Sequence, residues 1–345
     1  MKDYQVDVYG TFEGTEVLRY TFENEAGHRL VVMTYGATIL EYWTPDKNNT
    51  FENITIGFDN FEDYIQNAPK WGAAIGPVGG RIAKGQFTLN GQDYQLETNQ
   101  NGNHLHGGTT GFDGVLFQVD SVDNHGITLY EARPDGTGNY PGNLQTWITY
   151  SLDETGDLQI DYKMESDQDT LVNPTNHTYF NLLADDQKTV DSTIFQLNTK
   201  GLVTVNDNSI PTGQIDQESD VVKGLQEGLT FAQIFASDHP QLVSAGGLDH
   251  PFVLDLDVTE KGSLYEASNG RRLSFETDRP AVVVYTSNGY DDKTFIKGQV
   301  PKAHIGVALE TQQLPDAINQ EGFGDIRLLA GQVFQSTTIY HPSVV

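Results

Sequence analysis

Apolar and polar residues alternate along much of this chain, which is the pattern of strands that bury one face. The segment 87–96 has an Asn-Gly pair at positions 90–91, flanked by the alternating apolar residues Phe87, Leu89, Tyr94 and Leu96. Asn-Gly between two alternating runs is a strong signal of a β-hairpin. This segment therefore predicts two antiparallel strands joined by a tight turn.

The same alternation recurs with a longer turn at 153–157, between apolar positions in 148–152 and in 158–164. Residues 30–43 and 281–286 are rich in β-branched and aromatic side chains, which favour strands. The 35 glycines and 13 prolines punctuate these runs as turns. The pattern predicts an all-β fold, a large antiparallel β-sandwich, with residues 1–345 forming a single domain.

Helical periodicity is restricted to short stretches. The best examples are residues 61–66 and residues 225–236. The second lies inside the stretch 221–240, which is the expected excursion from the main sheets. No regular internal repeat and no low-complexity linker divides the chain.

Composition narrows the possible partners. The 20 basic and 48 acidic residues give a formal charge of -28, which repels phosphate backbones and anionic membranes, so neither nucleic acid nor a membrane is an expected partner. Cysteine is absent, and the N-terminal residues have no apolar signal core. These features predict a cytoplasmic protein, and the sequence leaves a monomer and a homodimer equally open.

Three polar islands stand out from the strand pattern: Asn103-His104-Leu105-His106-Gly107-Gly108, Asn173-Pro174-Thr175-Asn176-His177-Thr178-Tyr179-Phe180-Asn181, and Ala308-Leu309-Glu310-Thr311-Gln312. Amides and aromatic rings around a histidine suit a sugar site, because amides bind hydroxyls, rings cover C–H faces, and imidazole transfers protons near neutral pH. A single such island is equally consistent with a core histidine whose hydrogen bonds are satisfied within the fold.

Taken together and in order, these islands resemble those of the galactose mutarotase (aldose 1-epimerase) family. Further segments agree with it: Gly79-Gly80-Arg81-Ile82-Ala83-Lys84-Gly85, Gly246-Gly247-Leu248-Asp249-His250-Pro251-Phe252, and the run from Glu310 to Asn319. The resemblance extends from about residue 36 to the final strand. It implies a two-sheet β-sandwich with its site in a groove, and an enzyme that interconverts the α- and β-anomers of an aldohexose without a cofactor.

The resemblance also implies roles for individual residues. Glu310 matches the catalytic base, His177 the catalytic acid, and His106 the histidine beside the ring oxygen. The expected substrate-binding residues are Arg81, Asp249, Tyr285 and Asn176. Glu310 must be ionised and His177 protonated at the same pH for this acid and base to work. The unperturbed pKa values, about 4.3 for glutamate and 6.5 for histidine, allow this only in a narrow pH range below neutrality. The pKa of His177 is therefore expected to be raised by a nearby carboxylate.

His104 and His106 are two residues apart, so on a strand they would share a face. A His-x-His pair also suggests a metal site, but glycines and threonines follow it at 107–111, without an acid. We therefore expect no metal, with His104 as a structural residue or a residue at the rim of the site.

Three positions depart from the family pattern. Gly80 stands where many relatives have an asparagine, Gly76-Pro77 where the family often has Gly-Arg, and Val283 where some relatives have a sugar-contacting glutamine. These changes leave the proposed acid and base in place. They leave the preferred sugar open, because discrimination between hydroxyls depends on such polar contacts.

Alternative functions remain at this stage. A carbohydrate-binding protein of the same fold would need neither His177 nor Glu310 at a tuned protonation state. A glycoside hydrolase using Glu310 and Asp249 leaves the histidine islands unexplained. A hexose-6-phosphate epimerase needs a cationic pocket, which the charge of -28 disfavours. The substrate could also be the reducing end of a disaccharide such as maltose.

Overall fold

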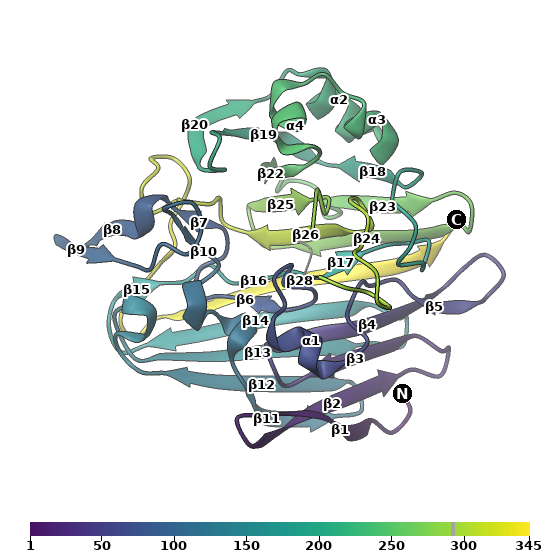
Figure 1. Ribbon diagram of the computed structural model, residues 1–345, viewed down its shortest axis with the longest axis horizontal. Helices are drawn as coiled ribbons and strands as arrows, with labels where there is room; N and C mark the ends of the chain where they lie inside the picture. The colour runs from purple at the N-terminus through teal and green to yellow at the C-terminus, as the bar shows by residue number, and fades with distance from the viewer. Residues whose placement is uncertain (291–293) are drawn as a thin grey trace.

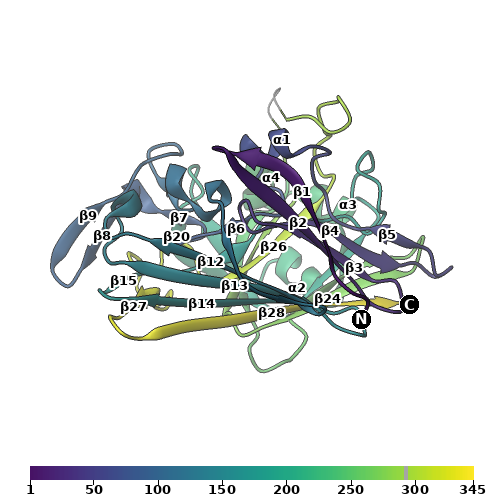
Figure 2. The same ribbon diagram turned by 90° about the horizontal axis from the view of Figure 1, so that it is seen from below.

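The computed structural model describes residues 1–290 and 294–345, and its strands form two stacked layers (Figures 1 and 2). In Figure 2, β12, β13, β14 and β28 lie together as one layer, and the N-terminal strands and β26 lie above it. This arrangement confirms the predicted all-β sandwich. Within the described ranges, no helix is both long and apolar enough to cross a membrane.

The largest sheet forms one whole layer and pairs its neighbouring strands antiparallel. Its strands, in spatial order, are β11 (Gln118–Asp123), β12 (Gly126–Arg133), β13 (Leu144–Leu152), β14 (Leu158–Ser166), β28 (Val333–Val344), β24 (Arg271–Thr277), β23 (Gly262–Glu266), β18 (Ile194–Leu197) and β21 (Leu229–Thr230).

Two smaller sheets form much of the opposite layer. The N-terminal sheet is a meander of β1 (Gln5–Phe12), β2 (Thr15–Glu23), β3 (Arg29–Met33), β4 (Thr38–Pro45) and β5 (Phe51–Asn53). The second sheet has the order β17 (Tyr179–Phe180), β26 (Val307–Gln312), β25 (Ala281–Tyr285), β22 (Asp249–Leu254), β19 (Thr199–Val205) and β20 (Pro211–Asp216). We call this second sheet the site sheet.

Short paired strands and helices complete the fold. The strand pairs are β7 (Arg81–Ile82) with β10 (His104–Leu105), β6 (Ala74–Ile75) with β16 (Thr175–Asn176), β8 (Gln86–Leu89) with β9 (Gln92–Gln95), and β15 (Thr170–Leu171) with β27 (Arg327–Leu328). The helices are α1 (Phe61–Ile65), α2 (Asp220–Glu227), α3 (Phe231–Phe235) and α4 (Pro240–Ala245), with 3₁₀ turns η1 (Ala83–Gly85), η2 (Gly108–Thr110), η3 (Phe112–Gly114) and η4 (Thr137–Asn139).

The main core lies between the layers, where the alternation seen in the sequence places one face of each strand. Ile148 and Tyr150 of β13 are fully buried there, together with Leu309 of β26. The layers also contact each other through a hydrogen bond, because the Tyr340 hydroxyl of β28 donates to the Leu309 carbonyl at 3.1 Å. Burial of one face of each strand is the driving force that the alternating pattern predicts.

The Asn-Gly hairpin is confirmed. Strands β8 and β9 pair antiparallel around Asn90 and Gly91, whose φ angles of 54° and 77° are both left-handed. Two successive positive φ angles are what a type I′ turn requires, and Asn-Gly accepts them at low cost. The hairpin projects from the left edge of the molecule in Figure 1.

The expected helix over 225–236 is wrong as one continuous element. The chain instead ends α2 at Glu227, passes through Gly228 with φ of 102°, and starts α3 only after the short strand β21. A residue with this φ cannot continue an α-helix, which is the physical reason for the break. The predicted excursion is confirmed, since α2, α3 and α4 lie together at the top of Figure 1, away from the main layers.

Candidate active site

Three neighbouring strands of the site sheet each place alternate residues in one cavity. On β26, Leu309 faces the core while Glu310 faces the cavity, and on β25 Val284 faces the core while Val283 faces the cavity. The register sets Val283 opposite Glu310 and Asp249 of β22 opposite Tyr285. The cavity-facing residues of these strands are Asp249, Pro251, Val283, Tyr285, Glu310 and Gln312.

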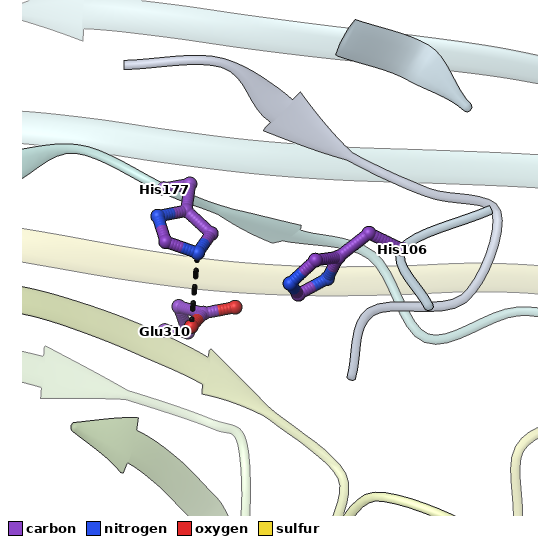
Figure 3. A group of neighbouring side chains, drawn as sticks. All are labelled: His106, His177 and Glu310. Atoms are coloured by element: carbon purple, nitrogen blue, oxygen red, sulfur yellow. Dashed lines mark ion pairs between the residues drawn. The ribbon is translucent and has the colours of Figure 1, made fainter. Parts of the chain in front are cut away.

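The opposite side of the cavity comes from segments distant in the sequence. Arg81 lies on β7, His106 follows β10, and His177 lies in the link between β16 and β17. The cavity has a volume of about 320 Å³, within the range typical of small-molecule sites. Figure 3 shows His106, His177 and Glu310 converging on one point from three different segments.

His177 lies directly against Glu310. Figure 3 marks this contact with a dashed line. Nε2 of His177 is 3.3 Å from Oε1 of Glu310, and both side chains are more than nine-tenths buried. The backbone fixes this position, because the His177 N–H donates to the Ala73 carbonyl at 2.9 Å. The imidazole also packs against the ring of Tyr179, with 5.0 Å between ring centroids.

Burial shifts the pKa values of the two groups in opposite directions. Desolvation disfavours the charged carboxylate and, with the nearby negative charge of Asp249, raises the pKa of Glu310 to about 8. Desolvation also disfavours the imidazolium, and with the positive charge of Lys70 it lowers the pKa of His177 to about 3. The expectation that a neighbouring carboxylate raises the pKa of His177 is therefore wrong for the free protein, because burial outweighs it.

This Glu310–His177 pair has the same number of bound protons over a wide pH range. Between its two pKa values, of about 3 and about 8, it holds one proton. Because the groups are close enough to titrate together, the proton belongs to the pair rather than to either residue. The pair can therefore accept one proton and donate another, which is what acid–base catalysis needs.

His106 is fixed as a neutral hydrogen-bond donor. The backbone N–H of Gly80 donates to its Nδ1 at 3.2 Å, so Nδ1 carries no proton and the ring proton is on Nε2. Burial and the neighbouring His177 keep the pKa of His106 well below its ordinary value. The ring lies perpendicular to that of His177, at 86°, with 5.4 Å between centroids.

The expected shared face of His104 and His106 is wrong. Strand β10 ends at Leu105, and His106 has a left-handed φ of 54°, so the two side chains diverge. His104 is fully buried, with Nε2 2.7 Å from the Tyr140 hydroxyl and Nδ1 2.8 Å from the Glu97 carbonyl. Its environment agrees with the predicted structural role.

Arg81 and Asp249 add opposite charges to the cavity wall. Arg81 Nε donates to Oε1 of Gln100 at 2.8 Å, which fixes the position of the guanidinium. The charge of Arg81 lowers the pKa of Glu310, whereas that of Asp249 raises it. The rings of Tyr285 and His177 are inclined at 70°, with 6.5 Å between their centroids.

The structure thus brings six of the predicted site residues into one cavity: Arg81, His106, His177, Asp249, Tyr285 and Glu310. Asn176 is not among the lining residues. Its amide nitrogen donates to the Gly72 carbonyl at 3.3 Å, and its oxygen accepts from the N–H and hydroxyl of Thr178. Asn176 faces away because adjacent residues of an extended chain point to opposite sides.

Sequence reasoning missed several lining residues, including Lys70, Tyr290 and Gln312. Lys70 forms an ion pair with Asp113, and its charge lowers the pKa of both His106 and His177. Neither Lys70 nor Tyr290 has a distinctive local pattern in the sequence. For Gln312 a signal existed, because it lies two residues after Glu310 and therefore shares its strand face.

The three residues His106, His177 and Glu310 also form a set that could hold a metal ion. Their ligand atoms lie within 4.8 Å of one another. Two imidazoles and a carboxylate are common ligands of divalent transition metals. The same three groups thus have two possible chemistries, metal binding and direct proton transfer.

Comparison with known proteins gives consistent results. Residues 18–341 match the aldose 1-epimerase family. The chain is 35% identical to galactose mutarotase of Bos taurus, over 92% of this chain and 91% of that protein, and 32% identical to maltose epimerase of Levilactobacillus brevis, over 96% of each. The crystal structure of galactose 1-epimerase from Lactobacillus acidophilus superimposes with a TM-score of 0.87 at 28% identity, covering 99% of this chain and 98% of that one.

Proposed function

Because this chain belongs to the aldose 1-epimerase family and is an aldose 1-epimerase, we propose that Glu310 and His177 carry its proton transfers on an aldohexose. The observation that carries this proposal is the 3.3 Å contact between His177 Nε2 and Glu310 Oε1 in a cavity lined by charged, polar and aromatic side chains that suit a sugar. Ring opening and closure need a base and an acid on one substrate, and this pair supplies both.

The reaction begins when carboxylate Glu310 removes the proton from the anomeric hydroxyl. The electrons of that O–H bond form the aldehyde C=O, the bond from C1 to the ring oxygen breaks, and the ring oxygen takes a proton from His177. Rotation about the C1–C2 bond then presents the other face of the aldehyde. Closure reverses each transfer, so Glu310 and His177 recover their starting protonation.

The single proton of the Glu310–His177 pair suits this cycle. The pair accepts one proton from the sugar and gives one back, so its net charge is constant through each step. A constant charge avoids the large cost of creating a net charge in a dry site. The Nε2–H of His106 donates toward the ring oxygen and helps to hold the developing charge.

Arg81, Asp249 and Tyr285 orient the sugar in this proposal. The guanidinium donates to hydroxyls, the carboxylate accepts from them, and the tyrosine ring covers a C–H face. Asn176 has no direct contact with the sugar. Its role is structural, because its hydrogen bonds shape the backbone on either side of His177.

A reducing disaccharide is the second candidate substrate. A neighbouring cavity of about 240 Å³ shares Val205, Ser209, Asp249 and Tyr285 with the first. Its remaining wall is rich in amides and hydroxyls, namely Asn206, Gln241, Ser244 and Asn288. Such groups suit the hydroxyls of a second sugar unit, and the similar protein from Levilactobacillus brevis is named a maltose epimerase.

Polarimetry of freshly dissolved α-anomers tests the proposed substrates. We expect the protein to accelerate the approach to equilibrium for galactose or glucose at micromolar enzyme or below. Maltose measured in parallel decides between the candidates, since a higher kcat/KM for maltose than for both hexoses would favour the disaccharide. Equal rates with and without protein for every sugar would reject the proposal.

We propose that this chemistry needs no metal, although His106, His177 and Glu310 could hold one. Direct proton transfer accounts for the contact between His177 and Glu310. Dialysis against a strong chelator should therefore leave the polarimetric rate unchanged, with the metal content followed by elemental analysis. Activity that disappears on chelation and returns with a divalent ion would contradict the metal-free mechanism.

We also infer that residues 1–345 form one domain, which works in the cytoplasm as a monomer or homodimer. One hydrophobic cluster, running from Tyr20 to Tyr340, includes residues of the N-terminal, large and site sheets, which supports one domain. The cysteine-free composition suits a reducing compartment.

A further inference from the structure

Gln312 is a buried amide that faces the cavity. It lies at the end of β26, two residues after Glu310 and on the same strand face, and its side chain has no exposure to solvent. Neither its Oε1 nor its Nε2 has a hydrogen-bond partner among the described residues. The amide can donate two hydrogen bonds and accept two, and none of these four is formed with the described residues.

Other buried amides behave differently. Asn181 is as deeply buried as Gln312, and its nitrogen donates to the carbonyls of Ile305, Lys188 and Asp185 at 2.7 to 3.1 Å. Asn173 likewise bonds the backbone of Gln313 through both its nitrogen and its oxygen. Buried amides in proteins are normally satisfied in this way, because an unpaired amide destabilises the fold. Gln312 is an exception that the fold alone does not explain.

Two glycines provide the space around this amide. A Cβ on Gly79 would lie 2.5 Å from Oε1 of Gln312. One on Gly80 would lie 3.1 Å from Pro315 and 3.6 Å from Nε2 of Gln312, at a φ of 70° that side chains rarely adopt. Small residues at these positions therefore keep this wall of the cavity open beside Arg81.

We propose that Gln312 is a sugar-binding and specificity-determining residue, whose amide exchanges hydrogen bonds with a ring hydroxyl held on the Arg81 side of the cavity. A hydroxyl both donates and accepts, as the amide does, so one sugar hydroxyl can use both of its atoms. Gln312 matters for recognition because Gly80 and Val283, two other residues of the cavity lining, have no polar side chain. The inference rests on the proposed function.

The test is Gln312→Met, which keeps the length of the side chain and removes its hydrogen-bonding groups. We expect KM to rise about tenfold, with a much smaller change in kcat, because the Glu310–His177 pair is untouched. Binding of 1,5-anhydrogalactitol, which has no anomeric hydroxyl and cannot react, should weaken by a similar factor in calorimetry. The melting temperature should stay the same or rise, since the variant removes an unpaired buried amide.

Gln313→Met is the matched control. The side chain of Gln313 is outside the cavity lining, and its Oε1 accepts from the N–H of Leu314 at 3.1 Å. We expect this variant to lower the melting temperature and leave KM unchanged, the opposite of the effect at Gln312. If Gln312→Met lowers the melting temperature and leaves KM and analogue binding unchanged, Gln312 is structural and the proposal is overturned.

Deoxy sugars identify the hydroxyl. Wild type and Gln312→Met are compared on aldohexoses that lack the hydroxyl at C2, C3, C4 or C6. The difference in KM between the variant and wild type should disappear with one of these sugars, the one that lacks the hydroxyl bound by Gln312. If the KM of the variant exceeds that of wild type by the same factor with all of these sugars, the proposal is overturned. Wild-type activity in the same assays tests the proposed function separately, because an active wild type with an unaffected variant contradicts only the role of Gln312.

Discussion

At the scale of single residues, the proposed chemistry depends on two ionisable groups whose burial costs the fold stability. Glu310 and His177 are more than nine-tenths buried, and each has its pKa moved toward the neutral form. Isolated, such groups are costly to bury. Placed 3.3 Å apart, they share one proton and remain ready to transfer it.

The first prediction concerns Glu310→Gln, which keeps shape and removes basicity. We expect the polarimetric rate to fall by about 10²–10⁴-fold or more, since general acid–base groups contribute this much. Glu310 has a raised pKa in the folded state, so wild type loses stability as the pH rises from about 4.5 to about 8. Glu310→Gln has no carboxyl group to ionise and does not lose stability in this way. Its free energy of unfolding in urea, compared with that of wild type, should therefore increase as the pH rises through this range. A near-normal rate would rule out Glu310 as the base.

The second prediction concerns the pH profile. Below a pKa of about 3 the Glu310–His177 pair holds two protons and has no base, and above a pKa of about 8 it holds none and has no acid. The kcat/KM should therefore form a broad plateau between these values, after subtraction of spontaneous mutarotation.

His177→Asn provides the control for this profile. Without the imidazole, residual activity should depend on ionised Glu310 alone, so it should rise rather than fall as the pH approaches about 8. If the alkaline fall persists unchanged in the variant, another group is the titrating acid, with His106 the first to test.

At the scale of elements, the alternation of side chains along a strand places one set of residues in the core and the other set in the cavity. On β26, Val307 and Leu309 enter the core while Glu310 and Gln312 enter the cavity, so the same strand stabilises the fold and presents the chemistry. A one-residue slip of register would exchange these faces. His106 reaches the cavity in another way. It follows β10 directly and has a left-handed φ of 54°, which turns its ring away from the side on which His104 lies.

The third prediction tests the hairpin of β8 and β9. Gly91 has a φ of 77°, and no atom lies within 4 Å of a Cβ built there, so Gly91→Ala isolates the cost of left-handed backbone. We expect a loss of about 1 kcal/mol in the free energy of unfolding. Gly114→Ala is the matched control, because it has equally open space without a positive φ and should be neutral. Equal losses in both variants would contradict this explanation.

At the scale of the whole molecule, one buried arginine connects the large sheet to the N-terminal sheet and to the segment that follows β17 of the site sheet. Arg271 begins β24 of the large sheet and is 2% exposed. Its guanidinium donates to the Leu182 carbonyl just beyond β17, and to the Thr50 carbonyl and Glu52 carboxylate of the N-terminal sheet, at 2.7 to 3.2 Å. It therefore fixes the relative positions of the layers that frame the site.

The fourth prediction is that Arg271→Ala lowers the free energy of unfolding by about 2–4 kcal/mol, because it removes a large buried side chain and the three hydrogen bonds that its guanidinium donates. Urea unfolding measures the loss, and KM of the folded enzyme should be unchanged because Arg271 is remote from the cavity lining. Arg272→Ala is the control, since Arg272 is more exposed and pairs with Glu260 near the surface. A comparable loss in the control would remove any special role for Arg271.

The sequence by itself determined the strands and the Asn-Gly hairpin, and its resemblance to a known family supplied six of the residues that line the cavity. The strands and the hairpin follow from local rules: side chains alternate along a strand, and Asn-Gly accepts two left-handed φ angles. The helix over 225–236 failed for a local reason too, because Gly228 adopts a φ of 102° that periodicity does not reveal.

Only the tertiary structure decided what those residues do to one another. The contact of His177 with Glu310, the downward shift of the His177 pKa and the turning away of Asn176 all depend on strands that meet from distant parts of the chain. The unpaired amide of Gln312 depends on Gly79 and Gly80, which approach it from another segment. Periodicity is a property of the local backbone, whereas distance, burial and dielectric environment are properties of the packed whole, and these last three set the chemistry of the site.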